Sequence, residues 1–188
     1  MRVHVIRHGK PAAVWGDSDD DPGLDETGRA QAEAVAERLL ALPPEERPTA
    51  VVSSPLRRCR ETAQPLADRL GVEVRIERAV GEIPTPAGLA ASERPAWLRS
   101  AFGGTWSQIV GDIDYDRWRR ESYSAVAAMP GVAVFSHFVA INGLISVLRD
   151  DDRVIGFRPD HTSVTTLDCA DGVLSLVALG AEATTSIL

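Results

Sequence analysis

The stretch VHVIRHGK, residues 3–10, joins a short β-branched run to two basic side chains and a glycine. Residues 3–6 are typical of a buried strand in a parallel sheet, whose two faces are both covered. Arg7 and His8 follow at once, so a cation stands beside a ring that titrates near neutral pH. This combination suits chemistry on an anion, provided that other segments supply partners.

Strand and helix patterns alternate along the rest of the chain. The expected strands are residues 49–52, 72–76, 132–135, 162–167 and 173–178, and the expected helices are residues 24–42, 56–70, 115–128 and 139–148. The last two strands are expected to form a hairpin around residues 170–172. This order predicts an α/β fold, a three-layer sandwich with a mostly parallel central sheet.

Local punctuation sets the expected helix ends. Asp25 is the expected N-cap of the first helix, and Pro43-Pro44 are expected to end this helix. Gly71 is expected to end the second helix, in which Pro65 is a point where the helix can kink or divide. Residues 83–111 are rich in Pro, Gly and Trp and show no regular pattern.

Composition bounds the class of protein. With 188 residues, 44% hydrophobic and 25% charged, the chain is expected to form one domain over residues 1–188. Its formal net charge of −7 argues against nucleic acid or an anionic membrane as the main partner. Cys59 and Cys169 form neither a disulfide framework nor a metal-spaced pair. No signal peptide or membrane span is expected, which favours a cytoplasmic protein.

Three expected strands end in chemically suggestive residues. They are Arg7-His8-Gly9, Ser53-Ser54-Pro55 ahead of Arg57-Arg58, and Ser136-His137. Ligands of α/β sheets bind at the carboxyl ends of the strands, near helix N-termini. If these strands are neighbours, the two histidines and the arginines form a cationic pocket, for which a phosphoryl group is the expected anion.

The same segments resemble the histidine phosphatase superfamily, which includes the cofactor-dependent phosphoglycerate mutases. The similar stretches, in chain order, are IRHGK (6–10), LDETGRAQA (24–32), SSPLRRCRETA (53–63), ERAVGE (77–82), FSHF (135–138) and SVTTLD (163–168). The resemblance implies a phosphoglycerate mutase-like fold, with residues 83–130 as a variable, cap-like region.

The resemblance also implies the site residues. His8 would be the nucleophile that becomes phosphorylated, with the proton of its other ring nitrogen held by an acceptor such as a main-chain carbonyl. Arg7, Arg58 and His137 would bind the phosphoryl oxygens. Arg58, rather than Arg57, falls on the arginine of the motif, and Arg57 can still reach the pocket rim.

Glu82 occupies the position of the general acid, where apolar neighbours favour its protonated form by desolvation. Glu77 and Asp112 are the substitutes for that role. The resemblance implies no metal and no cofactor, because the arginines take over the electrostatic role of a metal.

The function implied is a metal-independent phosphomonoester phosphatase of the histidine acid phosphatase type. Its substrate would be a small phosphorylated metabolite or a phosphoprotein. A phosphoglycerate mutase-type phosphotransferase and a catalytically silent phospho-ligand binding module are the alternatives. Two departures from the family pattern favour the phosphatase: Lys10-Pro11 follow the RHG, and Phe138 replaces a glycine and narrows or reshapes the pocket.

Several other residues have a functional and a structural interpretation. His4 and Cys59 are expected to be buried core residues. His161 precedes a strand and either overhangs the pocket or is structural, and the structural interpretation is favoured. The aspartates 17, 19, 20 and 21 do not match a calcium loop, because Pro22 stands where that loop needs glycine. Five aromatic residues either line a substrate cap or pack on the core, and the sequence does not choose: Trp97, Phe102, Trp106, Tyr115 and Trp118.

Overall fold

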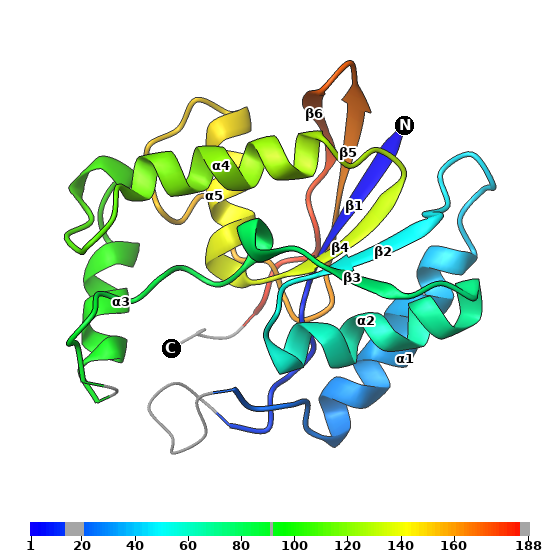
Figure 1. Cartoon of the computed structure of the whole chain (residues 1–188), viewed down its shortest axis with the longest axis horizontal. Helices are drawn as coiled ribbons and strands as arrows, with labels where there is room; N and C mark the ends of the chain where they lie inside the picture. Colours follow the sequence, from blue (N-terminus) through cyan, green and yellow to red (C-terminus); the bar gives the residue numbers. More distant parts are fainter. Residues whose placement is uncertain (14–20, 91, 185–188) are drawn as a thin grey trace.

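Six strands form one mixed sheet at the centre of the protein (Figure 1). The computed structural model describes residues 1–13, 21–90 and 92–184. The strands are β1 (Arg2–Arg7), β2 (Ala50–Ser53), β3 (Val74–Ile76), β4 (Val132–Ser136), β5 (Val164–Ala170) and β6 (Val173–Ala178), in the order β3-β2-β4-β1-β5-β6. The first four in this order pair in parallel, whereas β5 and β6 are antiparallel to their neighbours. The prediction of a mostly parallel sheet and a closing hairpin is confirmed.

Helices cover both faces of this sheet. On one side lie α1 (Glu26–Leu40) and α2 (Arg57–Leu70), and on the other lie α4 (Tyr115–Ala127) and α5 (Phe138–Leu148), with α3 (Arg94–Phe102) beyond them (Figure 1). Two short 3₁₀ turns, η1 (Arg78–Val80) and η2 (Trp106–Gln108), interrupt the connections. The protein is therefore an α/β sandwich of three layers.

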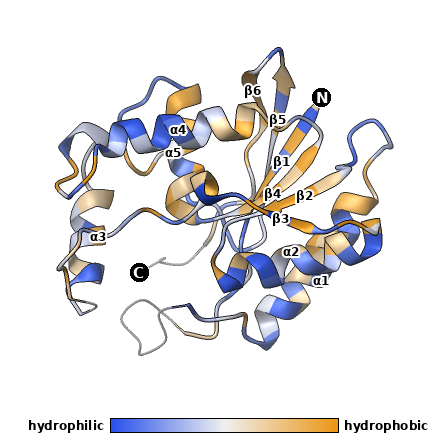
Figure 2. Ribbon diagram, in the orientation of Figure 1, coloured by the Kyte–Doolittle hydropathy of each residue, from blue (hydrophilic) through white to orange (hydrophobic). Residues whose placement is uncertain are grey.

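Side-chain alternation along the central strands builds the two cores. In β4, Val134 joins the cluster beneath α4 and α5, whereas its neighbours Ala133 and Phe135 join the cluster beneath α1 and α2. Val5 and Ile6 of β1 divide in the same way. The central strands are apolar at successive positions because both faces of the sheet are buried there. Figure 2 shows the central strands largely in hydrophobic colours and much of α2 and α4 in hydrophilic ones.

The expected helix punctuation is largely confirmed. The Asp25 carboxylate accepts a hydrogen bond from the Gly28 amide (2.7 Å) as the N-cap of α1, and Gly71 ends α2 in the left-handed conformation (φ 67°). Pro65 lies inside α2 without dividing the helix. A proline in a helix removes one backbone hydrogen bond, and here the next two residues, Leu66 and Ala67, are buried in the core.

The expectation that residues 83–111 are irregular is wrong in part, because α3 and η2 lie there. Their apolar residues form a third cluster against the outer side of α5. Trp106 and Tyr115 are fully buried in it, and Trp97, Phe102 and Trp118 pack around it. The five aromatic residues therefore pack on the core. Pro95 in the first turn of α3 and Gly103 directly after its end are the helix punctuation that the sequence pattern offered.

The acidic loop before α1 is described only in part. Asp17, Asp19 and Asp20 lie outside the described residues, and the Asp21 carboxylate accepts a hydrogen bond from the Arg57 amide (2.7 Å). No helix among the described residues is both long and apolar enough to cross a lipid bilayer.

Candidate active site

Strands β1, β2 and β4 are neighbours, so their carboxyl ends meet at one edge of the sheet. The register places Arg7 opposite Ser136, and Ser53 opposite Phe135. The backbone pairing continues one residue further, because the His8 amide donates to the Ser136 carbonyl (3.0 Å) and the Ser54 amide to the Phe135 carbonyl (3.0 Å). The strand pairing therefore fixes the positions of His8, Ser54 and His137 relative to one another.

His8 is held in one ring tautomer. Its Nδ1 lies 2.8 Å from the Gly9 carbonyl oxygen, and since a carbonyl only accepts, Nδ1 carries the proton. In the neutral ring Nε2 is then an unprotonated nitrogen, and it lies 3.3 Å from Nε of Arg58. The expected main-chain acceptor for His8 is thus present.

Burial keeps His8 uncharged. The pKa of His8 lies well below its ordinary value, because the ring is buried and because His137 and the positive charges of Arg58 and Arg7 act in the same direction. The ring centroids of His8 and His137 are 5.3 Å apart. At neutral pH the site therefore presents a neutral imidazole among cations.

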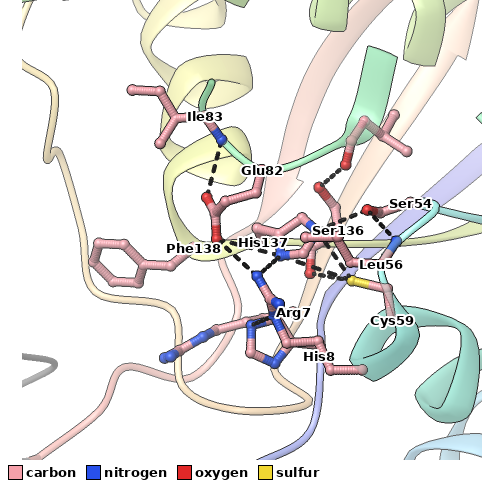
Figure 3. A network of polar contacts seen from close by, with 12 residues as sticks. Arg7, His8, Ser54, Leu56, Cys59, Glu82, Ile83, Ser136, His137 and Phe138 are labelled. Carbon is pink, nitrogen blue, oxygen red and sulfur yellow. Dashed lines mark hydrogen bonds and ion pairs between the residues drawn. The ribbon is translucent and has the colours of Figure 1, made fainter. Parts of the chain in front are cut away.

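Glu82 bridges Arg58 and His137. Its Oε2 lies 3.4 Å from a terminal nitrogen of Arg58. The same oxygen lies 3.3 Å from Nδ1 of His137, and Oε1 accepts from the Ile83 amide at 3.1 Å (Figure 3). Glu77 instead caps η1, and Asp112 accepts from the Ala87 amide. Of the three candidate carboxylates, Glu82 is therefore the one in contact with the expected phosphate-binding residues.

The expectation that desolvation keeps Glu82 protonated is wrong for the ligand-free protein. Burial does raise the pKa of Glu82, but His137, Arg58 and the Ile83 amide outweigh burial and lower this pKa to about 2. The residues next to Glu82 in the sequence are apolar, whereas two of the groups that lower its pKa are distant in sequence: Arg58 lies on α2 and His137 directly after β4. Glu82 is ionised at neutral pH in this state.

His137 is oriented by contacts on both ring nitrogens. Nε2 lies 2.7 Å from the Ser54 hydroxyl and 3.4 Å from Sγ of Cys59, and Nδ1 faces Glu82 (Figure 3). Burial lowers the pKa of His137 although Glu82 opposes this. Burial also raises the pKa of the Cys59 thiol, which is in keeping with an inert, buried residue.

Arg7 completes the cationic pocket. Burial lowers its pKa to about 10, in spite of Glu82 and Asp160, so the guanidinium stays charged at neutral pH. Its Cζ lies 5.3 Å from the ring centroid of Phe138, so Phe138 packs beside the guanidinium. Arg57, by contrast, is exposed and pairs with Glu61 (2.7 Å) on the surface of α2.

A cleft of about 390 Å³ adjoins Glu82. Its lining includes Pro55, Leu56, Ile83 and Pro84, with Arg78 at its side. Within residues 1–13, 21–90 and 92–184, no group of three or more His, Cys, Asp or Glu side chains is arranged to hold a metal ion. The cleft is large enough for a small organic group next to the Glu82 carboxylate.

His4 behaves as expected and His161 does not. Both ring nitrogens of His4 have partners in the core, the Glu46 carbonyl oxygen (2.7 Å) and the Thr166 hydroxyl (3.3 Å). Nε2 of His161, however, lies 3.1 Å from Arg7, and its ring centroid lies 5.8 Å from that of His8. His161 therefore lies beside the pocket rather than having only a structural place, because the antiparallel pairing of β5 with β1 brings the segment before β5 to the end of β1.

A model of the histidine phosphatase superfamily (branch 1) matches residues 3–182. The chain belongs to this superfamily. Over 193 aligned residues it is 27% identical to the 2,3-bisphosphoglycerate-dependent phosphoglycerate mutase of Thermoplasma acidophilum, and the match covers 95% of this chain and 94% of the mutase. The expected family and its phosphoglycerate mutase-like fold are confirmed.

The chain is also similar to a yeast protein in sequence and to a mycobacterial phosphatase in structure. The chain is 36% identical over 104 residues to the transcription factor tau 55 kDa subunit of Saccharomyces cerevisiae, a match that covers 46% of this chain and 23% of the yeast protein. The solved structure of a mycobacterial glucosyl-3-phosphoglycerate phosphatase in complex with VO3 is similar with a TM-score of 0.70 and 25% identity. That match covers 96% of this chain and 99% of the mycobacterial one.

Proposed function

We propose that the protein is a metal-independent phosphomonoester phosphatase that acts through a phosphohistidine at His8. One observation carries the proposal: the unprotonated Nε2 of a neutral, buried imidazole lies 3.3 Å from Arg58, whose guanidinium also contacts Glu82, and the ring of His137 and the charge of Arg7 lie close to the same imidazole. The expected partner is a small phosphorylated metabolite or a phosphoprotein, rather than nucleic acid or a membrane.

In the first half of the reaction, Nε2 of His8 attacks phosphorus and the bond from phosphorus to the ester oxygen breaks. Arg7, Arg58 and His137 hold the phosphoryl oxygens and offset the charge on them. Glu82 gives its proton to the leaving oxygen. In the second half, Glu82 takes a proton from water, the water oxygen bonds to phosphorus, and the bond from phosphorus to nitrogen breaks, which releases phosphate and neutral His8.

This scheme requires Glu82 to gain a proton when substrate binds. A bound phosphoryl group puts negative charge next to the carboxylate and takes over Arg58 and His137 as partners. Both effects raise the pKa of Glu82 from its low value in the free protein. The cleft beside Glu82 then receives the alcohol portion of the ester.

A phosphoglycerate mutase-type phosphotransferase is the second candidate, favoured by the similarity to the archaeal mutase over nearly all of both chains. A mutase would move the phosphoryl group between hydroxyls in the presence of a bisphosphate primer and would release little free phosphate. A silent binding module would bind phosphate without turnover. Product analysis therefore separates the three functions.

The decisive assay is phosphate release from a panel of phosphorylated metabolites in the presence of EDTA, which we expect to leave the activity unchanged. His8→Ala should abolish turnover, whereas His4→Gln, a change at a histidine within β1 and away from the pocket, should retain it. The wild type should yield an acid-labile, base-stable phosphoenzyme. Equal turnover by His8→Ala, or complete loss in EDTA that zinc restores, would contradict the proposal.

A further inference from the structure

The guanidinium of Arg7 is held by a segment far away in the sequence. One terminal nitrogen donates to the Pro159 carbonyl oxygen (2.9 Å), and the other lies 3.1 Å from Nε2 of His161. Nε of Arg7 is buried and has no hydrogen-bond partner among the described residues. The contacts from residues 159–161 thus occupy two of the five N–H donors of Arg7 and leave the other three, Nε among them, for a ligand.

The contact between Arg7 and His161 defines the state of the imidazole. A guanidinium has donors only, so Nε2 of His161 must accept, and the ring is neutral with its proton on Nδ1. Burial and Arg7 lower the pKa of His161 to about 4, and Lys10 acts in the same direction. The carboxylates of Asp160 and Asp25 oppose this shift without reversing it.

The backbone that carries His161 is fixed on both sides. The Asp160 amide donates to the Ala181 carbonyl (2.9 Å), and the Thr162 amide donates to the carbonyl of Arg7 itself (3.0 Å). Thr162 has a positive φ of 54°, a left-handed conformation that costs energy for a β-branched residue and persists where surrounding contacts impose it. The backbone contacts therefore fix the position of the His161 ring. On another side of the Arg7 guanidinium, the ring centroid of Phe138 lies 5.3 Å from Cζ.

We propose that His161 is a positioning residue, which accepts a hydrogen bond from Arg7 through Nε2 and thereby holds the guanidinium ready for the phosphoryl group. The inference rests on the proposed function, in which Arg7 binds phosphate. A free arginine side chain would lose much rotamer freedom on binding, and a guanidinium already held in place loses less of it on binding. His161 itself need not contact the substrate.

Inorganic phosphate is the probe, and two substitutions at His161 form a matched pair. His161→Phe keeps a ring but removes the acceptor, so phosphate should bind ~10–100-fold more weakly and KM should rise similarly. His161→Gln places an amide oxygen near the position of Nε2 and should restore most of the affinity. Wild-type affinity in His161→Phe, or no rescue by His161→Gln, would overturn the inference.

A double-mutant cycle tests whether His161 acts through Arg7. In an Arg7→Gln background, His161→Phe should have little further effect on phosphate affinity. An equal loss in both backgrounds would mean that the ring is merely structural and would overturn the inference. If His161→Phe fails to fold, nitrogen NMR of the wild type decides, because a protonated Nε2 at His161 would contradict the acceptor role.

The two proposals fail in different ways. A wild-type protein that binds inorganic phosphate but hydrolyses no ester would contradict the phosphatase, while the phosphate titrations above would still decide the role of His161. A wild-type protein that binds no phosphate at all would contradict both. Loss of phosphate binding in His161→Phe together with normal binding in His161→Gln would support the inference.

Discussion

Glu82 is the residue whose protonation state changes most during the proposed reaction. In the free protein His137 and Arg58 keep it ionised, with its pKa lowered to about 2. The same carboxylate must donate a proton to the leaving group, so its contacts with Arg58 and His137 must give way to the bound phosphoryl group. The charge state of Glu82 is thus tied to occupancy of the pocket.

Replacing Glu82 by Gln should therefore have an effect that depends on the leaving group. For an alkyl phosphate, whose alkoxide needs a proton, we expect kcat to fall ~10²–10⁴-fold. For p-nitrophenyl phosphate, whose leaving group is a weak base, the loss should be much smaller. Steady-state rates with both substrates measure this difference, and equal losses would argue that Glu82 acts only by holding Arg58 and His137.

At the scale of elements, the loop after β1 packs directly on the start of α1. A Cβ at Gly28 would meet the Lys10 carbonyl oxygen at 2.1 Å, and a Cβ at Gly9 would meet the Gly28 carbonyl oxygen at 2.7 Å. Backbone therefore touches backbone at the point where the chain leaves His8. The Gly9 amide also donates to the hydroxyl of Thr62 in α2 (2.9 Å), which ties the same loop to a second helix.

Gly28→Ala should disturb both stability and catalysis. The added methyl must push the loop away from α1, at a cost of ~1–3 kcal/mol in unfolding free energy, and it should displace His8 and lower kcat/KM. Gly172→Ala is the control, because its Cβ has open space and only the positive φ (75°) in the β5–β6 turn opposes it. Urea unfolding and phosphate release measure the two effects, and full activity in a destabilised Gly28→Ala would contradict the coupling.

At the scale of the whole molecule, the fold holds its histidines uncharged. The chain has four, His4, His8, His137 and His161, and burial lowers the pKa of each. Below the ordinary histidine pKa of ~6.5 the unfolded chain takes up protons that the native protein does not. The contribution of the neutral histidines to the free energy of unfolding is therefore fully favourable above this pH and declines as the pH falls below it.

We expect the free energy of unfolding to fall below pH ~6.5 by up to ~1.4 kcal/mol per pH unit for each histidine that stays neutral in the native state. Urea unfolding at a series of pH values measures the slope. His4→Gln, which lies outside the pocket, should reduce the slope by about one proton. An unchanged slope in this variant would mean that His4 is not held neutral by the fold.

The architecture and the core of the site could be predicted because both follow from local patterns. Apolar runs such as residues 132–135 indicate strands buried on both faces, and the carboxyl ends of parallel strands share one edge of a sheet. Arg7, His8 and His137 are therefore brought together by the order of the strands alone. The helix α3 was not predictable in this way, because its stability comes from packing of Leu98 in the aromatic cluster rather than from its own pattern.

The sequence alone determined which chemical groups stand at the strand ends, because alternation and the residues that follow each strand are local properties of the chain. Only the tertiary structure decided the charge of Glu82 and the place of His161. The pKa of a buried group depends on partners that are distant in sequence, here Arg58 and His137 for Glu82. The contact of His161 with Arg7 depends on the antiparallel pairing of β5 with β1, which no local pattern encodes.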